Sequence, residues 1–148
     1  ATAFNDCGLP DDVDIDAIYK GPTREEPCGE EGTYGLNVMG FGDIPARLNS
    51  DTIAYTCPYE DNATGDYVEA DIAISRDVDW AMSLDDCEGF EELLEATVTH
   101  EVGHVFGLGH VSERRHGDLT MSTRSNGACT DDEITLGLGD VLALEELY

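Results

Sequence analysis

Positive charge is nearly absent from this sequence. Its 148 residues include 7 lysines and arginines, with Lys20 as the single lysine, against 33 aspartates and glutamates, and the formal net charge is −26. Clustered lysine and arginine bind nucleic acids and anionic membrane surfaces. The composition therefore predicts neither nucleic acid nor membrane as a partner. The acidic residues have two interpretations: a solvated surface for an extracellular or salty setting, or loops that bind cations.

Long apolar runs and closely spaced cysteine pairs are also missing. No stretch has the length and apolarity of a transmembrane helix. No C-x-x-C pair indicates a zinc ribbon or a thioredoxin-like motif. The five cysteines are instead scattered, and in a small acidic chain this favours disulfides and a secreted, extracellular protein. They are Cys7, Cys28, Cys57, Cys87 and Cys129.

The odd number of cysteines leaves two alternatives. Either one thiol is free, or its partner belongs to a segment that this chain lacks, which could then be an N-terminal segment held covalently. For Cys7 a disulfide, for example with Cys28, is expected rather than a role as a zinc-blocking thiol, given the secreted setting.

The length predicts a single domain over residues 1–148. Residues 1–33 are rich in Asp, Glu, Gly and Pro and read as a loop-rich N-terminal segment. One short strand is expected there, and three more follow it. The first of the three is apolar almost throughout, as a central strand is, and the last alternates apolar and polar residues. The four expected strands cover residues 13–19, 34–42, 51–57 and 67–75.

Two helices are expected after the strands. Within residues 87–107, a helical period joins Leu94, Val98, Val102 and Val105 in one core-facing stripe, and the glutamates of residues 88–95 occupy the N-terminal half. Residues 139–148 form a short C-terminal helix with Asp140 as its N-cap. Strands first and helices later predict an α+β fold.

Histidine is scarce too, yet three of the four histidines lie in the stretch "THEVGHVFGLGH". His100 and His104 are four residues apart, so on a helix they face the same way and can bind one metal ion. Glu101 lies beside them, within reach of a metal-bound water. Gly107 can adopt a positive φ and turn the chain, which brings His110 to the same metal. Three imidazoles leave one zinc position open, as in a catalytic site.

The pattern has more than one functional interpretation. The first is a zinc hydrolase in which Glu101 acts as general base and then as general acid. A second is a non-catalytic zinc-binding or interaction module, although metal binding alone does not need Glu101. A third is a metallohydrolase whose substrate is not a peptide. The remaining histidine, His116, is expected to be a loop residue without a role at the metal.

The segment "HEVGHVFGLGH", followed by "LTMS", resembles the metzincin signature, with Met121 as the methionine of its Met-turn. Within the metzincins the likeness is to matrixins and to small matrixin-like proteases secreted by bacteria. It extends over residues 34–148 through "TIAYTCPYE", "YVEADIAISRDVDW" and "DEITLGLGDVLALEELY". The resemblance implies a twisted, mostly parallel sheet with an antiparallel edge strand, an active-site helix and a C-terminal helix.

The resemblance also implies an activity. The chain would be a monomeric, secreted zinc endopeptidase whose peptide substrate lies extended along the edge strand. Residues that would bind this peptide are Thr52, Ile53, Ala54 and Tyr55 on the strand, and Ser122, Thr123 and Arg124 beside the pocket for the side chain after the scissile bond.

Some features depart from the matrixin pattern. No histidine precedes His100, so a second, structural zinc is not expected, and calcium binding stays open without assigned residues. The segment between His110 and Met121 is longer than is usual in matrixins. Residues 1–33 contain no candidate for the N-terminal helix that backs the matrixin sheet, so this chain either lacks that helix or has lost it.

Overall fold

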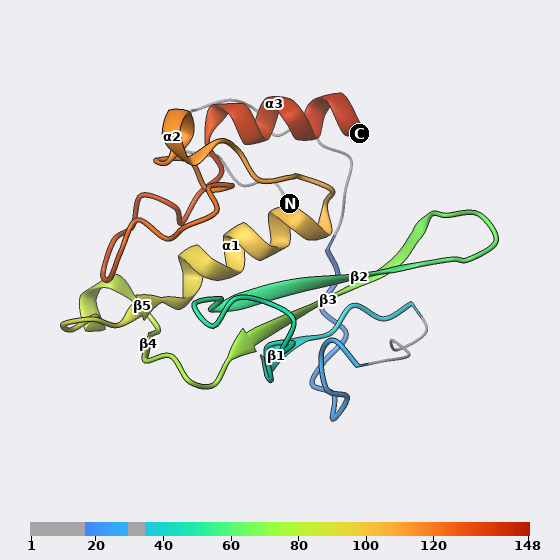
Figure 1. Cartoon of the computed structure of the whole chain (residues 1–148), viewed down its shortest axis with the longest axis horizontal. Coiled ribbons are helices and arrows are strands. Elements are labelled where there is room, and N and C mark those ends of the chain that lie inside the picture. Colours follow the sequence, from blue (N-terminus) through green and yellow to red (C-terminus); the bar gives the residue numbers. More distant parts are fainter. Residues whose placement is uncertain (1–16, 30–34) are drawn as a thin grey trace. The chain divides into compact units, whose positions relative to one another are not determined.

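The computed structural model describes residues 17–29 and 35–148 (Figure 1). These residues form two compact units. One unit is Gly21–Val78, and the other is Asp79–Tyr148 together with the described residues up to Lys20. The single domain expected from the length stays a prediction, and each unit is described by itself.

The unit Gly21–Val78 is built on a three-stranded sheet of β1 (Met39–Gly42), β2 (Ala54–Glu60) and β3 (Tyr67–Ser75). The order is β1-β3-β2, with β1 parallel and β2 antiparallel to β3. Together with the helices of the other unit, this mixed sheet makes the fold α+β, as predicted. Among the described strands the sheet is mixed rather than mostly parallel.

The predicted bounds of β3 are confirmed, but those of its neighbours are not. β3 lies between the other strands, whereas β1, expected to be central, is at an edge of the described sheet and begins only at Met39. β2 begins at Ala54 and continues to Glu60, where it pairs with Tyr67. Its extent is decided by pairing with β3 across the hairpin, which local composition does not reveal.

The strand expected at residues 13–19 cannot be followed in full. Residues 13–16 lie outside the described residues. Ala17, Ile18 and Tyr19 are not in a strand.

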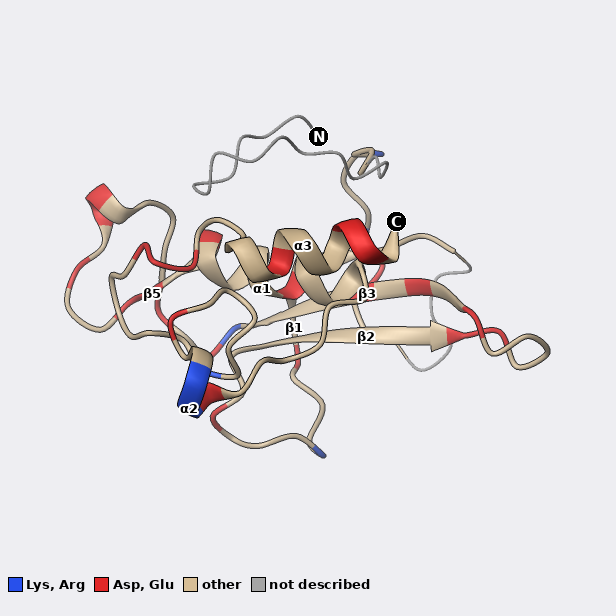
Figure 2. Cartoon of the chain, turned by 90° about the horizontal axis from the view of Figure 1, so that it is seen from above, with Lys and Arg blue, Asp and Glu red and all other residues tan. Residues whose placement is uncertain are grey.

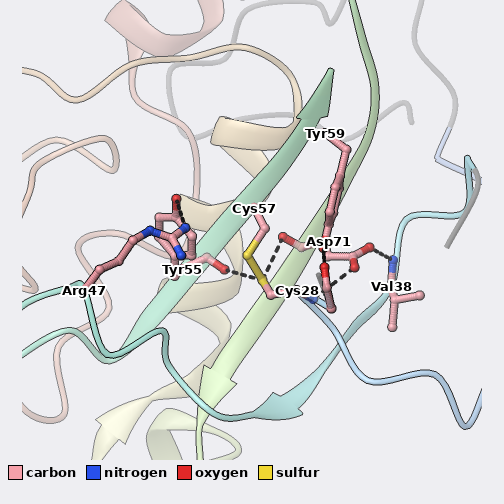
Figure 3. The surroundings of a disulfide bond; sticks show 8 residues. Cys28, Val38, Arg47, Tyr55, Cys57, Tyr59 and Asp71 are labelled. Atoms are coloured by element: carbon pink, nitrogen blue, oxygen red, sulfur yellow. Dashed lines mark hydrogen bonds between the residues drawn. A yellow bond between two sulfur atoms is a disulfide. The ribbon is translucent and has the colours of Figure 1, made fainter. Parts of the chain in front are cut away.

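A fully buried carboxylate on β3 holds the chain before β1. Asp71 accepts hydrogen bonds from the backbone N–H groups of Cys28 (3.0 Å) and Val38 (2.8 Å) (Figure 3). Burial raises the pKa of Asp71, and these two hydrogen bonds counter that rise. Glu69, on the same face of the strand, accepts from the N–H of Gly35 in the same way (2.6 Å). The alternation predicted for this strand does not separate a buried from an exposed side here, because the polar residues Glu69 and Asp71 are themselves buried and accept hydrogen bonds from backbone N–H groups.

The disulfide next to Asp71 corrects one expectation. Cys28 is bonded to Cys57 on β2, not to Cys7 (Figure 3). Cys7 lies outside the described residues. A second disulfide, Cys87–Cys129, belongs to the other unit.

The other unit holds the helices. Its elements are β4 (Trp80–Ala81), η1 (Leu84–Asp86), β5 (Glu92–Leu93), α1 (Leu94–Val105), α2 (Glu113–His116) and α3 (Leu138–Leu147). β4 and β5 pair in parallel just before α1 begins. No helix among residues 17–29 and 35–148 is long and apolar enough to cross a membrane.

Both predicted helices begin elsewhere than expected. α1 begins at Leu94, because the residues before it include Gly89 with φ +71° and Glu92 in β5, so the glutamates 88–92 precede the helix. Its buried residues are Ala96, Glu101 and Gly103, while the predicted apolar stripe is half-buried. In α3 the N-cap is Gly137, and Asp140 accepts the N–H of Gly137 from within the first turn (3.1 Å).

Candidate metal centre

Three histidine side chains converge in the second unit. α1 carries His100 and His104 one turn apart, and Gly107, with φ +91°, turns the chain after the helix so that His110 reaches them. The Nε2 atom of His104 lies 3.1 Å from that of His100 and 3.0 Å from that of His110, and the third separation is 3.2 Å. The spacing in the sequence therefore produces the predicted cluster.

Hydrogen bonds to backbone carbonyls define the tautomers of two of these rings. The Nδ1 of His100 is 2.6 Å from the carbonyl oxygen of Thr120, and the Nδ1 of His104 is 2.8 Å from that of Leu108. A carbonyl oxygen only accepts, so each Nδ1 is the protonated nitrogen that donates. The Nε2 atoms of both rings then carry lone pairs that face each other, an arrangement that a bound cation stabilises.

The geometry of the cluster fits a zinc ion. Nitrogen ligands at about 2.0–2.1 Å from a tetrahedral zinc are about 3.3 Å apart, close to the separations found. Burial lowers the pKa of both His100 and His110, which favours the neutral, metal-binding form. Among the described residues, this is the one group of three or more potential ligands gathered closely enough to hold a metal ion.

Glu101 lies at the edge of the cluster. Its side chain is buried, and its charge raises the pKa of His110 against the larger effect of burial. The carboxylate is therefore near enough to His110 for its charge to act on that ring.

Met121 is buried in the same unit as the histidines, against the glycine that precedes His104. It is 1% exposed and packs with Leu108 and Leu144 in a buried cluster. Its carbonyl oxygen accepts the N–H of Val111 (2.9 Å), so the Met-turn is attached directly to the chain that follows His110.

The chain after Met121 forms a loop whose ends are close together. The hydroxyl of Thr120 donates to the carbonyl of Thr135 (2.6 Å), and the disulfide Cys87–Cys129 joins the loop to the chain before β5. Ser122 and Thr123 lie at its start, and their hydroxyls donate to the Glu113 carboxylate. These bonds, chiefly that of Ser122, lower the pKa of Glu113. The sequence did not point to Glu113, because its partners Ser122 and Thr123 are nine and ten residues away and no motif links them to it.

Glu133, in the same loop, was also missed. It is 7% exposed, and its Oε2 accepts a long hydrogen bond from the N–H of Asn126 (3.4 Å), while Oε1 has no partner among the described residues. Burial raises the pKa of Glu133 to about 7, and the charges of Asp132, Glu113 and Glu92 add to that rise. Glu133 stands among other acidic residues in the sequence, so nothing there indicates that its side chain is buried.

Acidic side chains occur on the helices α1, α2 and α3 and on many loops, and α2 carries two arginines as well (Figure 2). His116, expected in a loop, is the last residue of α2. It lines a cavity of about 280 Å³ together with Leu119, Asp140 and other residues of α3 and of the loop after α1. It is not part of the histidine cluster.

The expected peptide-binding residues on the strand lie in the other unit. Ala54 and Tyr55 are in β2, with Thr52 and Ile53 just before it. The Tyr55 side chain contacts Arg47, whose guanidinium lies 5.5 Å from the ring centre. Their role toward a substrate stays a prediction, as does that of Ser122, Thr123 and Arg124.

The described site has the arrangement of a three-histidine metal centre: two histidines on one helical turn, a third after a glycine turn, a buried glutamate directly after the first, and a buried methionine in the same unit. A comparison with protein families agrees with this class. The sequence model of the matrixin family matches residues 52–148, and the chain belongs to that family. No curated protein sequence matches the chain.

Proposed function

We propose that this matrixin is a secreted zinc endopeptidase. The observation that carries the proposal is the convergence of the Nε2 atoms of His100, His104 and His110 within 3.0–3.2 Å, next to the buried Glu101. Membership of the matrixin family supports peptide hydrolysis as the reaction. The disulfides Cys28–Cys57 and Cys87–Cys129 support an oxidising, extracellular setting.

The chemistry divides between the metal and the chain. When bound by the three histidines, zinc supplies a Lewis acid that lowers the pKa of water and polarises the scissile carbonyl. Glu101 accepts the proton of the attacking water and then donates it to the nitrogen of the leaving amine. The carbonyls of Thr120 and Leu108 hold the His100 and His104 rings in the tautomer that presents Nε2.

The substrate would bind in an extended form. β2 pairs with β3 on one side, so among the described strands its other side offers backbone groups to a peptide strand. Thr52, Ile53, Ala54 and Tyr55 would make these contacts. Ser122, Thr123 and Arg124 would border the pocket for the side chain after the scissile bond.

A test separates metal binding from catalysis. In Glu101→Gln we expect one bound zinc, as in the wild type, and a loss of casein cleavage of about 10²–10⁴-fold, the usual contribution of a general base. Glu95→Gln, an exposed change on the same helix, is the matched control and should keep full activity.

Two outcomes would overturn the proposal. A wild-type protein that binds one zinc but cleaves neither casein nor gelatin would be a zinc-binding module rather than a protease. A Glu101→Gln variant with full activity would remove Glu101 from the mechanism.

A further inference from the structure

Helix α2 lies in the segment between His110 and Met121, which is longer than is usual in matrixins. Glu113 is its first residue. The Glu113 Oε2 atom accepts hydrogen bonds from the hydroxyls of Ser122 (2.5 Å) and Thr123 (3.2 Å). Hydrogen bonds to an ionised carboxylate are among the stronger ones in proteins. The extra segment is thus bonded to the chain that leaves the Met-turn.

The Glu113 contacts are the second connection between the same two segments. The first is the backbone hydrogen bond from Val111 to the carbonyl of Met121 (2.9 Å). Val111 follows His110 directly, and Ser122 follows Met121 directly. The two connections therefore attach the residues that follow His110 to the buried Met121 and to the two residues after it.

His110 depends on such support more than the other two histidines do. The Nδ1 atoms of His100 and His104 donate to carbonyls, and both rings start from α1. His110 is exposed, is in no helix or strand, and among the described residues makes no Nδ1 hydrogen bond to a carbonyl. The backbone after His110 is held by the contacts of Val111 and Glu113, so the placement of the ring depends on them.

Ser122, which donates to the Glu113 carboxylate, is itself held in place. It is 2% exposed, and its backbone N–H donates to the carbonyl of Leu119 (2.8 Å), so it cannot move freely toward or away from α2. Glu113 is an exposed side chain bonded to a buried hydroxyl. The bond therefore restrains α2 and the loop after His110 against a rigid part of the site.

We propose that Glu113 is a positioning residue that keeps the third zinc ligand and the start of the substrate pocket in fixed positions relative to each other. Through α2 it fixes the His110 loop, and through Ser122 and Thr123 it fixes the residues expected to border the pocket after the scissile bond. The inference rests on the proposed zinc centre, and it predicts that removal of this carboxylate weakens metal binding and changes which side chain is accepted there.

The test uses the zinc-loaded full chain and its cobalt-substituted form. We expect Glu113→Ala to release zinc to a chelator about tenfold faster, at the lower end of the effects known for residues that support metal ligands. The visible d–d absorption of bound Co²⁺ should shift, because it reports ligand geometry. With a peptide library, the preference at the position after the cut should broaden. Glu113→Gln retains one acceptor oxygen and should fall between the wild type and Glu113→Ala.

Two further variants complete the design. Ser122→Ala removes the shorter of the two hydrogen bonds to Glu113 and should reproduce most of the effect of Glu113→Ala, and the double variant should be no worse than Glu113→Ala alone, since the two changes remove a shared interaction. Glu146→Ala, an exposed glutamate on α3, removes the same charge and should leave all three readouts unchanged.

Unchanged zinc release and unchanged Co²⁺ absorption in Glu113→Ala and Ser122→Ala would overturn the proposal, as would additive effects in the double variant. The metal readouts need no proteolysis. If the protein binds zinc but cleaves no peptide, they still decide the role of Glu113 while the proposed function fails.

Discussion

Gly103 and Met121 are packed so closely that no side chain fits between them. A Cβ placed on Gly103 would overlap the Sδ atom of Met121, which is 1% exposed. Gly103 lies directly before His104, one of the three clustered histidines, on α1. Met121 and α1 are therefore in contact through a residue that can only be glycine without rearrangement.

For Gly103→Ala we expect a loss of stability of about 1–3 kcal/mol, the usual cost of forcing extra volume into a packed core. The measurement is urea unfolding of the zinc-loaded protein. Gly109→Ala is the control, because a Cβ there meets no atom within 4 Å. Equal stability of the two variants would show that Met121 can move aside.

Gly107 makes the turn that brings His110 to the other ligands. Its φ of +91° is unfavourable for any residue with a side chain. We expect Gly107→Ala to lose about 1–2 kcal/mol of stability and, in addition, to bind zinc more weakly, as measured by competition with a chelator.

Gly127→Ala is the matched control for this turn. Gly127 has φ +110° and a Cβ there meets no atom within 4 Å, so the backbone strain is similar, but no ligand follows it. It should lose stability without losing zinc affinity. Equal zinc affinities in the two variants would contradict the role of Gly107.

The disulfide Cys87–Cys129 holds the loop after the Met-turn against the chain before β5. The N–H of Cys129 donates to the carbonyl of Glu91 (3.2 Å), and Ser125 donates to Glu92 (2.8 Å). Replacing both cysteines with serine should cost about 2–4 kcal/mol and make residues 122–135 accessible to an added protease. Limited proteolysis followed by mass spectrometry locates the cuts.

The Cys28–Cys57 pair provides the comparison. Its replacement by serines should also lower stability, but the unit that it crosslinks does not include the loop, so no new cuts should appear at 122–135. Cuts at these residues in both double variants would indicate general unfolding instead of local release.

Glu133 should make stability depend on pH. Burial raises its pKa from 4.5 to about 7, so across that interval the folded chain keeps a proton that the unfolded chain has released. The contribution of Glu133 to stability therefore falls as pH rises through this interval, by no more than about 3 kcal/mol in total, and is level above it.

The variant Glu133→Gln removes this titration with little change in shape. With a chelator present, so that zinc release does not contribute, we expect the variant to match the wild type at about pH 5 and to exceed its stability at about pH 8. Urea unfolding at the two pH values gives the comparison. A difference between variant and wild type that is the same at both would exclude Glu133 as the cause.

Local sequence was sufficient for the core of the metal site. Four residues between His100 and His104 make one helical turn, and Gly107 permits the positive φ that brings His110 back; both rules act over a few residues. For the same reason the bounds of β3 could be predicted, since Gly65 and Asp66 precede it and Arg76 ends its alternating apolar series. The histidine cluster and the α+β class thus required no long-range information.

Contacts between residues far apart in the sequence could not be predicted and are known only from the tertiary structure. Pairing across the hairpin decided where β2 ends, and the folded backbone decided that Cys28 meets Cys57 and not Cys7. Whether an acidic residue is solvated or buried depends on what covers it, so Asp71, Glu113 and Glu133 looked alike in an acidic sequence. In the folded chain Asp71 accepts hydrogen bonds from backbone N–H groups, and Glu113 accepts the hydroxyl of Ser122, next to Met121. Glu133 is buried, with one carboxylate oxygen that has no partner among the described residues.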